Sequence, residues 1–334
     1  MTIMTPNDAA KAAVAQLKTS PGSGLLACWE MANSDKDGAE ALVAAGACPV
    51  LLALSASDDA VGAWKVMARL AWWGHGGDFE VEPFVERAVA AVTKLDVVGA
   101  YAYYALRGYL GGSGSELKMQ GFRERQMIVA GAGRAEVLSK CVAVSPPSTA
   151  ALLLYLMKLI ICRNNANCRA VFEAGLLDTV LHMIESEVGG PEVSYQGCLI
   201  ASELVKFALQ EKAHARARGS GLRACACAVK VATVYRTNSR VATSALFLMM
   251  ALSKDPVCRR GLLSEGARES LASICRGGAT IATPVIQRVM YDLGMTLRTK
   301  RVFLSPGDAE TKYLQLKVRY DRLRAKFDGL KRRL

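Results

Sequence analysis

The stretch RAVFEAGLLDTVLHMIESE, residues 169–187, decides the fold. It predicts two short helices separated by Gly175, because glycine readily adopts the left-handed conformation that ends a helix. In the second helix, apolar residues recur at i, i+3, i+4 and i+7, which is the spacing of one helix face: Leu177, Val180, Leu181 and Ile184. Helices this short are not stable alone, so the unit needs neighbours of its own kind.

The same pattern recurs along the chain, in residues 41–54, 126–138, 216–229 and 261–274. The glycines of the five copies are 85, 44, 46 and 45 residues apart, and the first step covers two periods. A period in the middle forties built from apolar helices is typical of a HEAT or armadillo solenoid. The glycines that separate the helices are Gly46, Gly131, Gly175, Gly221 and Gly266.

The copy at residues 172–181 resembles the armadillo repeat most closely, through the motif x-E-A-G-x-(L/P)-x-x-(L/V)-L. The resemblance implies an all-α fold, a right-handed superhelical solenoid of about six three-helix repeats with a concave groove. It also implies a binding protein and not an enzyme. We expect an N-terminal capping helix and turn in residues 1–23, the solenoid in 24–299 and a basic C-terminal helix in 300–334.

The resemblance also indicates where a ligand is bound. In the family, a Trp and an Asn of the third helix of a repeat point into the groove, and Trp29 and Asn33 occupy these places. A buried Trp and a helix-ending Asn are an equally good interpretation of this pair. The later equivalents are mostly basic, with the register open by one residue. The predicted groove-binding residues are Trp29, Asn33, Lys65, Arg69, Tyr103, Arg107 and Lys158.

Four tyrosines crowd the predicted third helix of the second repeat, residues 97–110: Tyr101, Tyr103, Tyr104 and Tyr109. Tyrosine offers rigid contact area with a polar tip, which suits a binding face. The second repeat also lacks a clear first helix. The alternative is therefore that two of the four tyrosines fill the space that this helix leaves.

Residues 308–334 predict one long helix with a different period. Its apolar residues alternate at spacings of three and four, which is the seam of a coiled coil. Basic residues flank the seam, so one interpretation is that the helix binds an acidic partner helix, and the other is that it caps the last repeat. The residues predicted to bind the partner helix are Leu316, Tyr320, Leu323, Phe327, Leu330 and Leu334.

Composition agrees with a long solenoid. Hydrophobic residues make up 51% of the 334-residue chain, and Lys and Arg outnumber Asp and Glu by 42 to 30. The basic excess favours acidic partners, nucleic acid or an anionic membrane surface. The ten cysteines are expected to be reduced, because residues 1–19 lack secretory features. The longest apolar run, 150–162, contains Lys158 and is too short to span a membrane.

A search for chemistry finds little. The three histidines, His75, His182 and His214, fall in different repeats, and Cys225 and Cys227 have no second thiol pair at zinc spacing. The glycine-rich GGSGS at 111–115 lacks the Lys and the preceding strand of a P-loop. We therefore expect no metal, no cofactor and no catalytic residue.

Two functions stay open. The first is a scaffold that binds acidic or extended protein segments in its groove and a partner helix through its C-terminus. The second is an adaptor of the nuclear-transport type or a nucleic-acid-associated repeat protein. A groove lined with Lys and Arg repels the basic peptides of import adaptors, and nucleic acid ranks second because the aromatics do not alternate with basic residues repeat after repeat. A cytoplasmic subunit of a cytoskeletal or ciliary assembly is the preferred hypothesis, without homo-oligomerisation.

Overall fold

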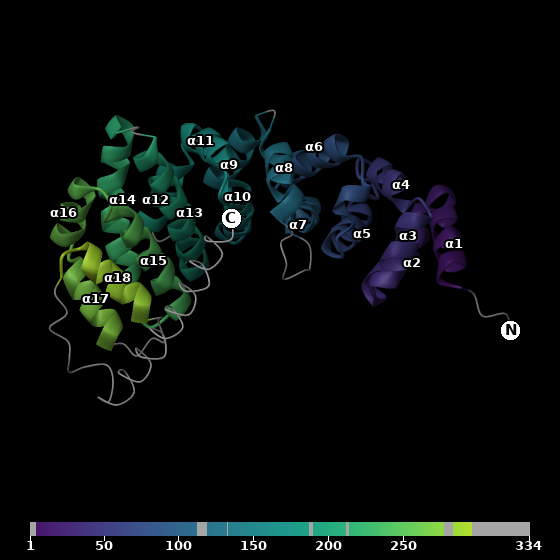
Figure 1. The fold of residues 1–334 in the computed structure, drawn as a ribbon. Coiled ribbons are helices and arrows are strands. Elements are labelled where there is room, and N and C mark those ends of the chain that lie inside the picture. The colour runs from purple at the N-terminus through teal and green to yellow at the C-terminus, as the bar shows by residue number, and fades with distance from the viewer. Residues whose placement is uncertain are drawn as a thin grey trace, which may run out of the picture. The chain divides into compact units, whose positions relative to one another are not determined.

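A computed structural model of the protein describes residues 5–111, 119–131, 133–186, 190–211, 214–276 and 283–295. In these ranges the chain forms eighteen α-helices, one 3₁₀ helix and no strand, which confirms the all-α prediction. The chain divides into two compact units, Met1–Val289 and Met290–Leu334. The first unit contains α1 to α17 and the start of α18 (Figure 1).

The helices are short and follow one another closely. They are α1 (Pro6–Thr19), α2 (Pro21–Ser34), α3 (Lys36–Ala44), α4 (Ala47–Leu54), α5 (Ala60–Trp72), η1 (His75–Asp78), α6 (Val81–Val92), α7 (Val97–Gly111), α8 (Met119–Ala130), α9 (Arg134–Val144), α10 (Pro147–Ile161), α11 (Asn165–Glu173), α12 (Leu176–Glu185), α13 (Gly190–Gln210), α14 (His214–Val234), α15 (Ser239–Leu252), α16 (Pro256–Ser264), α17 (Ala267–Arg276) and α18 (Thr283–Asp292).

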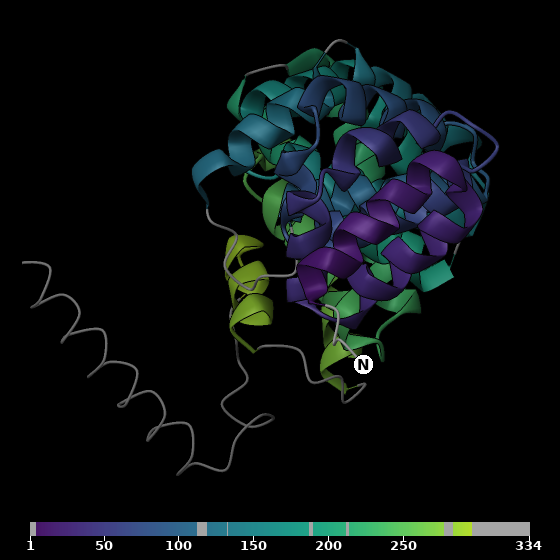
Figure 2. The same cartoon turned by 90° about the vertical axis from the view of Figure 1, so that its right-hand side faces the viewer.

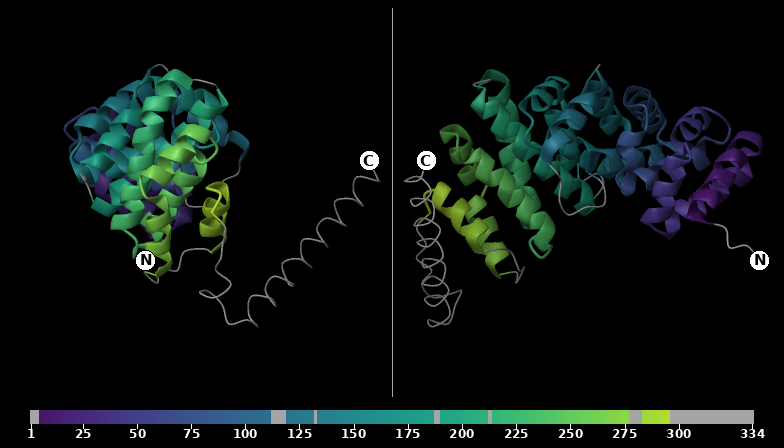
Figure 3. Two further views of the ribbon diagram at one scale, coloured as in Figure 1. Left: turned by 90° about the vertical axis from the view of Figure 1, so that its left-hand side faces the viewer. Right: turned by 45° about the vertical axis from the view of Figure 1, so that its right-hand side comes forward.

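After α1 and α2, six repeats follow in chain order: α3–α5, η1–α7, α8–α10, α11–α13, α14–α15 and α16–α17, with α18 after the last. From α3 onward, the principal helix pairs lie within one repeat or join adjacent repeats, as expected of a solenoid. The third helices form one series, in which α2 packs on α5, α5 on α7, α7 on α10, α10 on α13 and α13 on α15. The right panel of Figure 3 shows the helices of this unit following one another in chain order.

Each repeat contributes a strip to one continuous apolar core. The buried side chains of α5 include Trp64, Met67 and Leu70, and those of α12 include Val180 and Leu181. Burying a side chain of this size contributes about 1.5–3 kcal/mol. The core therefore stabilises helices that would not persist alone.

The glycine junctions follow the sequence prediction at three of five positions. Gly46, Gly175 and Gly266 have φ values of 83°, 80° and 89°, and each separates two helices of a repeat. In the third repeat the prediction was wrong by two residues, because the left-handed residue is Gly133 and not Gly131. The sequence offers two glycines here, and the prediction chose the first of them in place of the second.

Gly221 does not break a helix, so the prediction for the fifth repeat was wrong. α14 continues through it, and this repeat has two helices in place of three. A Cβ atom at this position would lie 2.9 Å from the Sγ of Cys258 on α16. The glycine at this point therefore allows α14 and α16 to pack closely.

The N-terminal helix α1 buries Ala10, Ala13, Val14 and Leu17 against α2, α3 and α4. The capping role of this helix stays a prediction. The turn expected at the end of residues 1–23 is shorter than predicted, because α2 already begins at Pro21. Proline suits the first turn of a helix, where no N–H is needed. Prolines also start α10 and α16.

The 3₁₀ helix η1 stands where the second repeat lacks its first helix. Phe79 stacks on Phe84 at 4.9 Å between ring centres, and Tyr109 meets Phe84 edge-on at 5.8 Å. Tyr109 is only 5% exposed, so it fills space here as the second interpretation proposed. Figure 2 shows α1 to α6 at the near end of the same unit.

Two predicted elements lie outside the described residues. They are the loop at 299–307 and the helix at 308–334 with its seam residues Leu316, Tyr320, Leu323, Phe327, Leu330 and Leu334. Among the described helices, none is by itself long and apolar enough to cross a membrane. One pair, Lys36–Ala44 with Ala47–Leu54, has that length and composition together but is bent by 86°.

Candidate binding face on the third helices

The third helices carry cations and aromatic rings on the side that faces away from the core. In α5, Lys65, Arg69 and Trp72 are spaced at i, i+4 and i+7 and so share one face. Their neighbours Trp64 and Met67 point into the core and are fully buried. The helical period thus separates a structural face from a face that is available for binding.

The first contacts of this face join α2 to α5. The Nζ of Lys65 lies 4.2 Å from the ring centre of Trp29, and the guanidinium of Arg69 lies 5.0 Å from that of Trp73. Trp73 Nε1 donates a 2.9 Å hydrogen bond to the carbonyl of Ala32 at the end of α2. Arg69 Nη2 is 3.5 Å from the carbonyl oxygen of Asn33. These bonds fix the rings and the cations relative to each other.

The contacts continue across the next helices. Arg107 on α7 lies between Trp72 and Tyr155, with 5.8 Å and 4.8 Å to the two ring centres. Lys158 on α10 lies 5.8 Å from Tyr155 and 6.0 Å from Tyr195 on α13. We call the whole series the cation–aromatic ladder. Its members are Trp29, Lys65, Arg69, Trp72, Trp73, Arg107, Tyr155, Lys158, Tyr195 and Arg240.

The ladder ends on α15, where Arg240 lies 3.9 Å from the ring centre of Tyr195. Arg240 also pairs with Glu192, at 3.1 Å. By contrast, among the described residues no carboxylate lies within ion-pair distance of Lys65, Arg69, Arg107 or Lys158. These four cations are half-buried, and a cation–π contact is worth about 0.5–1 kcal/mol at an exposed site and about 2 kcal/mol when it is desolvated. The contacts hold these four cations in place without neutralising them.

Five predicted groove residues are members of the ladder: Trp29, Lys65, Arg69, Arg107 and Lys158. Asn33 is exposed at its edge. Tyr103 differs from the prediction, because it is only 3% exposed. It lies on the side of α7 that packs toward α10. Burial raises the pKa of its hydroxyl, although the positive charge of Arg107 acts to lower that pKa.

Sequence reasoning missed Trp72, Trp73, Tyr155, Tyr195 and Arg240. A usable signal was present, since a tyrosine stands three residues before the cation in both α7 (Tyr104, Arg107) and α10 (Tyr155, Lys158). The prediction that aromatics and basic residues do not alternate was therefore wrong. They do alternate, but most ring–cation pairs join neighbouring helices, and the linear sequence does not place the two residues of such a pair together.

The described residues contain no group of three or more His, Cys, Asp or Glu side chains that is arranged to hold a metal ion. His75 Nδ1 lies 2.8 Å from Asp78 within η1, which is a local contact. Burial raises the pKa of several thiols, and a protonated thiol is a poor nucleophile. Those raised to about 12 are Cys28, Cys48, Cys168, Cys198 and Cys227.

Comparison with known proteins identifies the fold. No protein-family model and no curated protein matches the sequence. An engineered protein of known structure is similar with a TM-score of 0.67 and 18% identity, over 85% of this chain and 68% of its own. A designed armadillo repeat protein is similar with a TM-score of 0.50 and 15% identity, over 85% of this chain and 99% of its own. The fold is thus an armadillo-like helical repeat, as the motif predicted.

Proposed function

We propose that the protein is a non-enzymatic scaffold that holds an extended, acidic segment of another protein along the cation–aromatic ladder. One observation carries the proposal: Lys65, Arg69, Arg107 and Lys158 lie on three successive third helices with no carboxylate partner in the described chain. A row of fixed, uncompensated cations attracts carboxylates.

The length of the ladder favours an extended ligand. It crosses six third helices, from α2 to α15. Packed helices lie about 8–10 Å apart, so the series covers roughly 45 Å. An extended chain rises about 3.3 Å per residue and needs roughly 14 residues to span it. A single side chain or a small ligand would contact only one pair of neighbouring helices in the ladder.

The sign of the ladder also ranks the possible partners. A basic peptide of the kind bound by nuclear-import adaptors would meet like charge at every step, which disfavours it. Acidic protein tails and acidic linear motifs fit. A cytoplasmic, cytoskeletal or ciliary assembly remains our specific hypothesis for where such a segment is found, with the helix at 308–334 binding a second, acidic partner helix.

Nucleic acid is the second candidate, and the alternation of rings and cations favours it. Proteins that bind single strands use such alternation, because bases stack on aromatic faces beside a basic track. In the ladder, however, each ring already has a cation over it, and a base would have to displace that cation. A carboxylate has only to approach the exposed side of the cation, so protein ranks first.

A binding assay with three fluorescent probes tests the proposal. The probes are peptides of about ten glutamates or ten lysines and a single-stranded RNA of about ten uridines, each titrated with the full chain. We expect the glutamate peptide to bind, the lysine peptide to be rejected, and affinity for glutamate to fall with added salt. Preferred binding of the RNA, or equal binding of both peptides, would overturn the proposal.

A further inference from the structure

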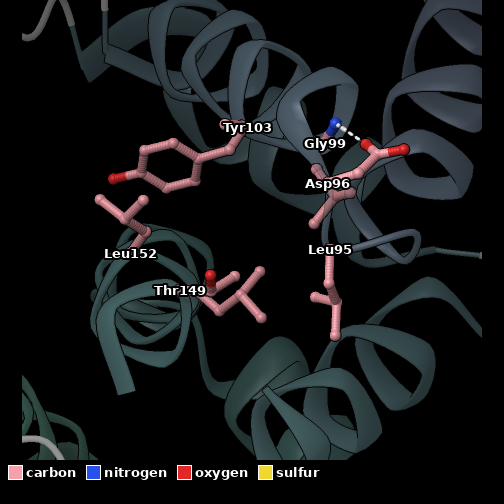
Figure 4. Close-up of a pocket in the computed structure, with 9 residues that line it drawn as sticks. Leu95, Asp96, Gly99, Tyr103, Thr149 and Leu152 are labelled. Carbon is pink, nitrogen blue, oxygen red and sulfur yellow. Dashed lines mark hydrogen bonds between the residues drawn. The ribbon is translucent and has the colours of Figure 1, made fainter. Parts of the chain in front are cut away.

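A small pocket opens between α7 and α10 (Figure 4). Leu95 and Asp96 from the α6–α7 turn, Tyr103 from α7, and Thr149 and Leu152 from the start of α10 surround it. Val92, Gly99, Ala100 and Leu153 complete the lining. The wall is therefore mainly aliphatic and aromatic.

Local backbone geometry keeps this pocket open. Leu95 has a φ of 56°, a left-handed conformation that turns the chain sharply between α6 and α7. Asp96 Oδ1 accepts a 2.9 Å hydrogen bond from the N–H of Gly99 and so caps α7. A Cβ atom at Gly99 would lie 2.8 Å from the carbonyl oxygen of Ala91, so the turn packs tightly on α6. The gap remains on the other side, toward α10.

The size of the pocket suits one side chain. Its volume is about 40 Å³, which is room for about three water molecules. Pockets for drug-sized ligands are far larger, at about 300–1,000 Å³. A pocket of this size is too small for such a ligand, but it accepts an aliphatic side chain whose backbone stays outside.

Tyr103 connects the pocket to the ladder. Its ring forms one wall beside Leu152 (Figure 4). Burial raises the pKa of its hydroxyl, and the positive charge of Arg107 acts in the opposite direction. Arg107 follows Tyr103 by one helical turn and lies over Tyr155. An aliphatic side chain in the pocket and a carboxylate on Arg107 are thus within reach of neighbouring residues of one segment.

We propose that the α7–α10 pocket binds a leucine-sized aliphatic side chain of the acidic segment, so that the scaffold recognises acidic sequences with an embedded apolar residue. This inference rests on the proposed function and adds to it the sequence preference of the binding face.

Two labelled peptides of about eleven residues test the pocket, each with glutamates around a central alanine or a central leucine. For the full chain we expect the leucine peptide to bind about tenfold more tightly, because more aliphatic surface is removed from water. Thr149→Phe, which fills the mouth, should reduce that preference to less than about twofold while the alanine peptide binds as before. Leu152→Ser tests the same point without added volume and covers the case in which Thr149→Phe does not fold.

The outcomes separate the two proposals. If neither peptide binds, the scaffold proposal fails. If both bind equally to the unchanged protein, the pocket is wrong and the ladder stands. A leucine preference that persists in folded Thr149→Phe and Leu152→Ser would place the apolar side chain elsewhere and also overturn the inference. Asp96→Asn keeps the helix cap and should bind the leucine peptide at least as tightly as the unchanged chain.

Discussion

The guanidinium of Arg107 on α7 lies 4.8 Å from the ring centre of Tyr155 on α10, in the next repeat. The same cation is 5.8 Å from Trp72 on α5, in the preceding repeat. One side chain thus connects three repeats on the face that is opposite the core. Because the contact partners come from different repeats, the charge is positioned by the stacking of the solenoid and not by its own helix alone.

The close approach of α5 and α7 gives a prediction about stability. A Cβ atom at Gly108 would lie 2.7 Å from the backbone carbon of Ala71 and 2.8 Å from the nitrogen of Trp72. Gly108→Ala should therefore lower the free energy of unfolding by about 1–3 kcal/mol, even though alanine favours helix. Urea unfolding followed by circular dichroism measures the effect. The control is Gly111→Ala, where a Cβ atom meets nothing within 4 Å and stability should not fall.

A buried amide cluster ties α8 to α10 and α11. Asn167 Nδ2 donates to the carbonyl oxygens of Gln126, at 3.2 Å, and Ile160, at 2.9 Å. Asn167→Ala leaves both acceptors without this donor and should cost about 2–3 kcal/mol of unfolding free energy. Asn165→Ala, at an exposed position two residues earlier, should change it by less than about 0.5 kcal/mol. Equal effects of the two substitutions would contradict this account.

Buried thiols predict how stability depends on pH. Burial raises the pKa of Cys198 from 9.0 to about 12, and four further thiols are raised to the same value. Above pH 9 the unfolded chain loses these protons first, so the folded state binds more protons and unfolding becomes easier as pH rises. Stability should be unaffected by these groups below pH 9 and should fall between pH 9 and 12.

The measurement is the urea midpoint at several pH values from neutral to alkaline. Each thiol contributes a slope of at most about 1.4 kcal/mol per pH unit. Cys198→Ala removes one thiol and should make the alkaline slope shallower. An unchanged slope in that variant would show that this thiol does not titrate with unfolding.

The sequence predicted the repeat architecture because the apolar period and the glycine junctions are local. Gly46, Gly175 and Gly266 each mark a real left-handed residue. The prediction of a helix break at Gly221 was wrong for a reason of tertiary structure. A glycine is needed there because the Sγ of Cys258 packs close to it, and not because the chain turns. A glycine required by close packing and a glycine required by a turn are identical in sequence.

The binding face was predictable only in part. Lys65, Arg107 and Lys158 were found from their place in the third helix. Tyr155 and Tyr195 were missed, because Tyr155 is contacted by Arg107 from α7 and Tyr195 is contacted by Arg240 from α15, far away along the chain. Tyr103 was assigned to the exposed face, but a one-residue shift in register puts Tyr104 there, and Tyr104 is 43% exposed.

The C-terminal seam gives a prediction that rests on sequence alone. Deleting residues 327–334 removes Phe327, Leu330 and Leu334 from the predicted coiled coil. If the helix binds a partner, the thermal midpoint of the isolated protein should stay within about 1 °C, because no core residue is lost. A large drop in the midpoint would show instead that the helix caps the last repeat.

Charge reversal on the ladder tests the central claim most directly. The test variant carries Arg107→Glu and Lys158→Glu. Arg69 is left unchanged, because it packs on Trp73 and its reversal would also disturb the end of α2. The matched control, Lys11→Glu with Lys140→Glu, makes the same change in net charge at exposed sites on α1 and α9. Both proteins are titrated against the labelled glutamate peptide at low and at high salt.

We expect the ladder variant to lose at least about tenfold in affinity at about 50 mM salt and to approach the unchanged protein at about 400 mM, since exposed charges are screened. The control should stay within about twofold of the unchanged protein. Equal losses in the two variants would mean that net charge alone attracts the peptide, and the ladder would not be its binding site.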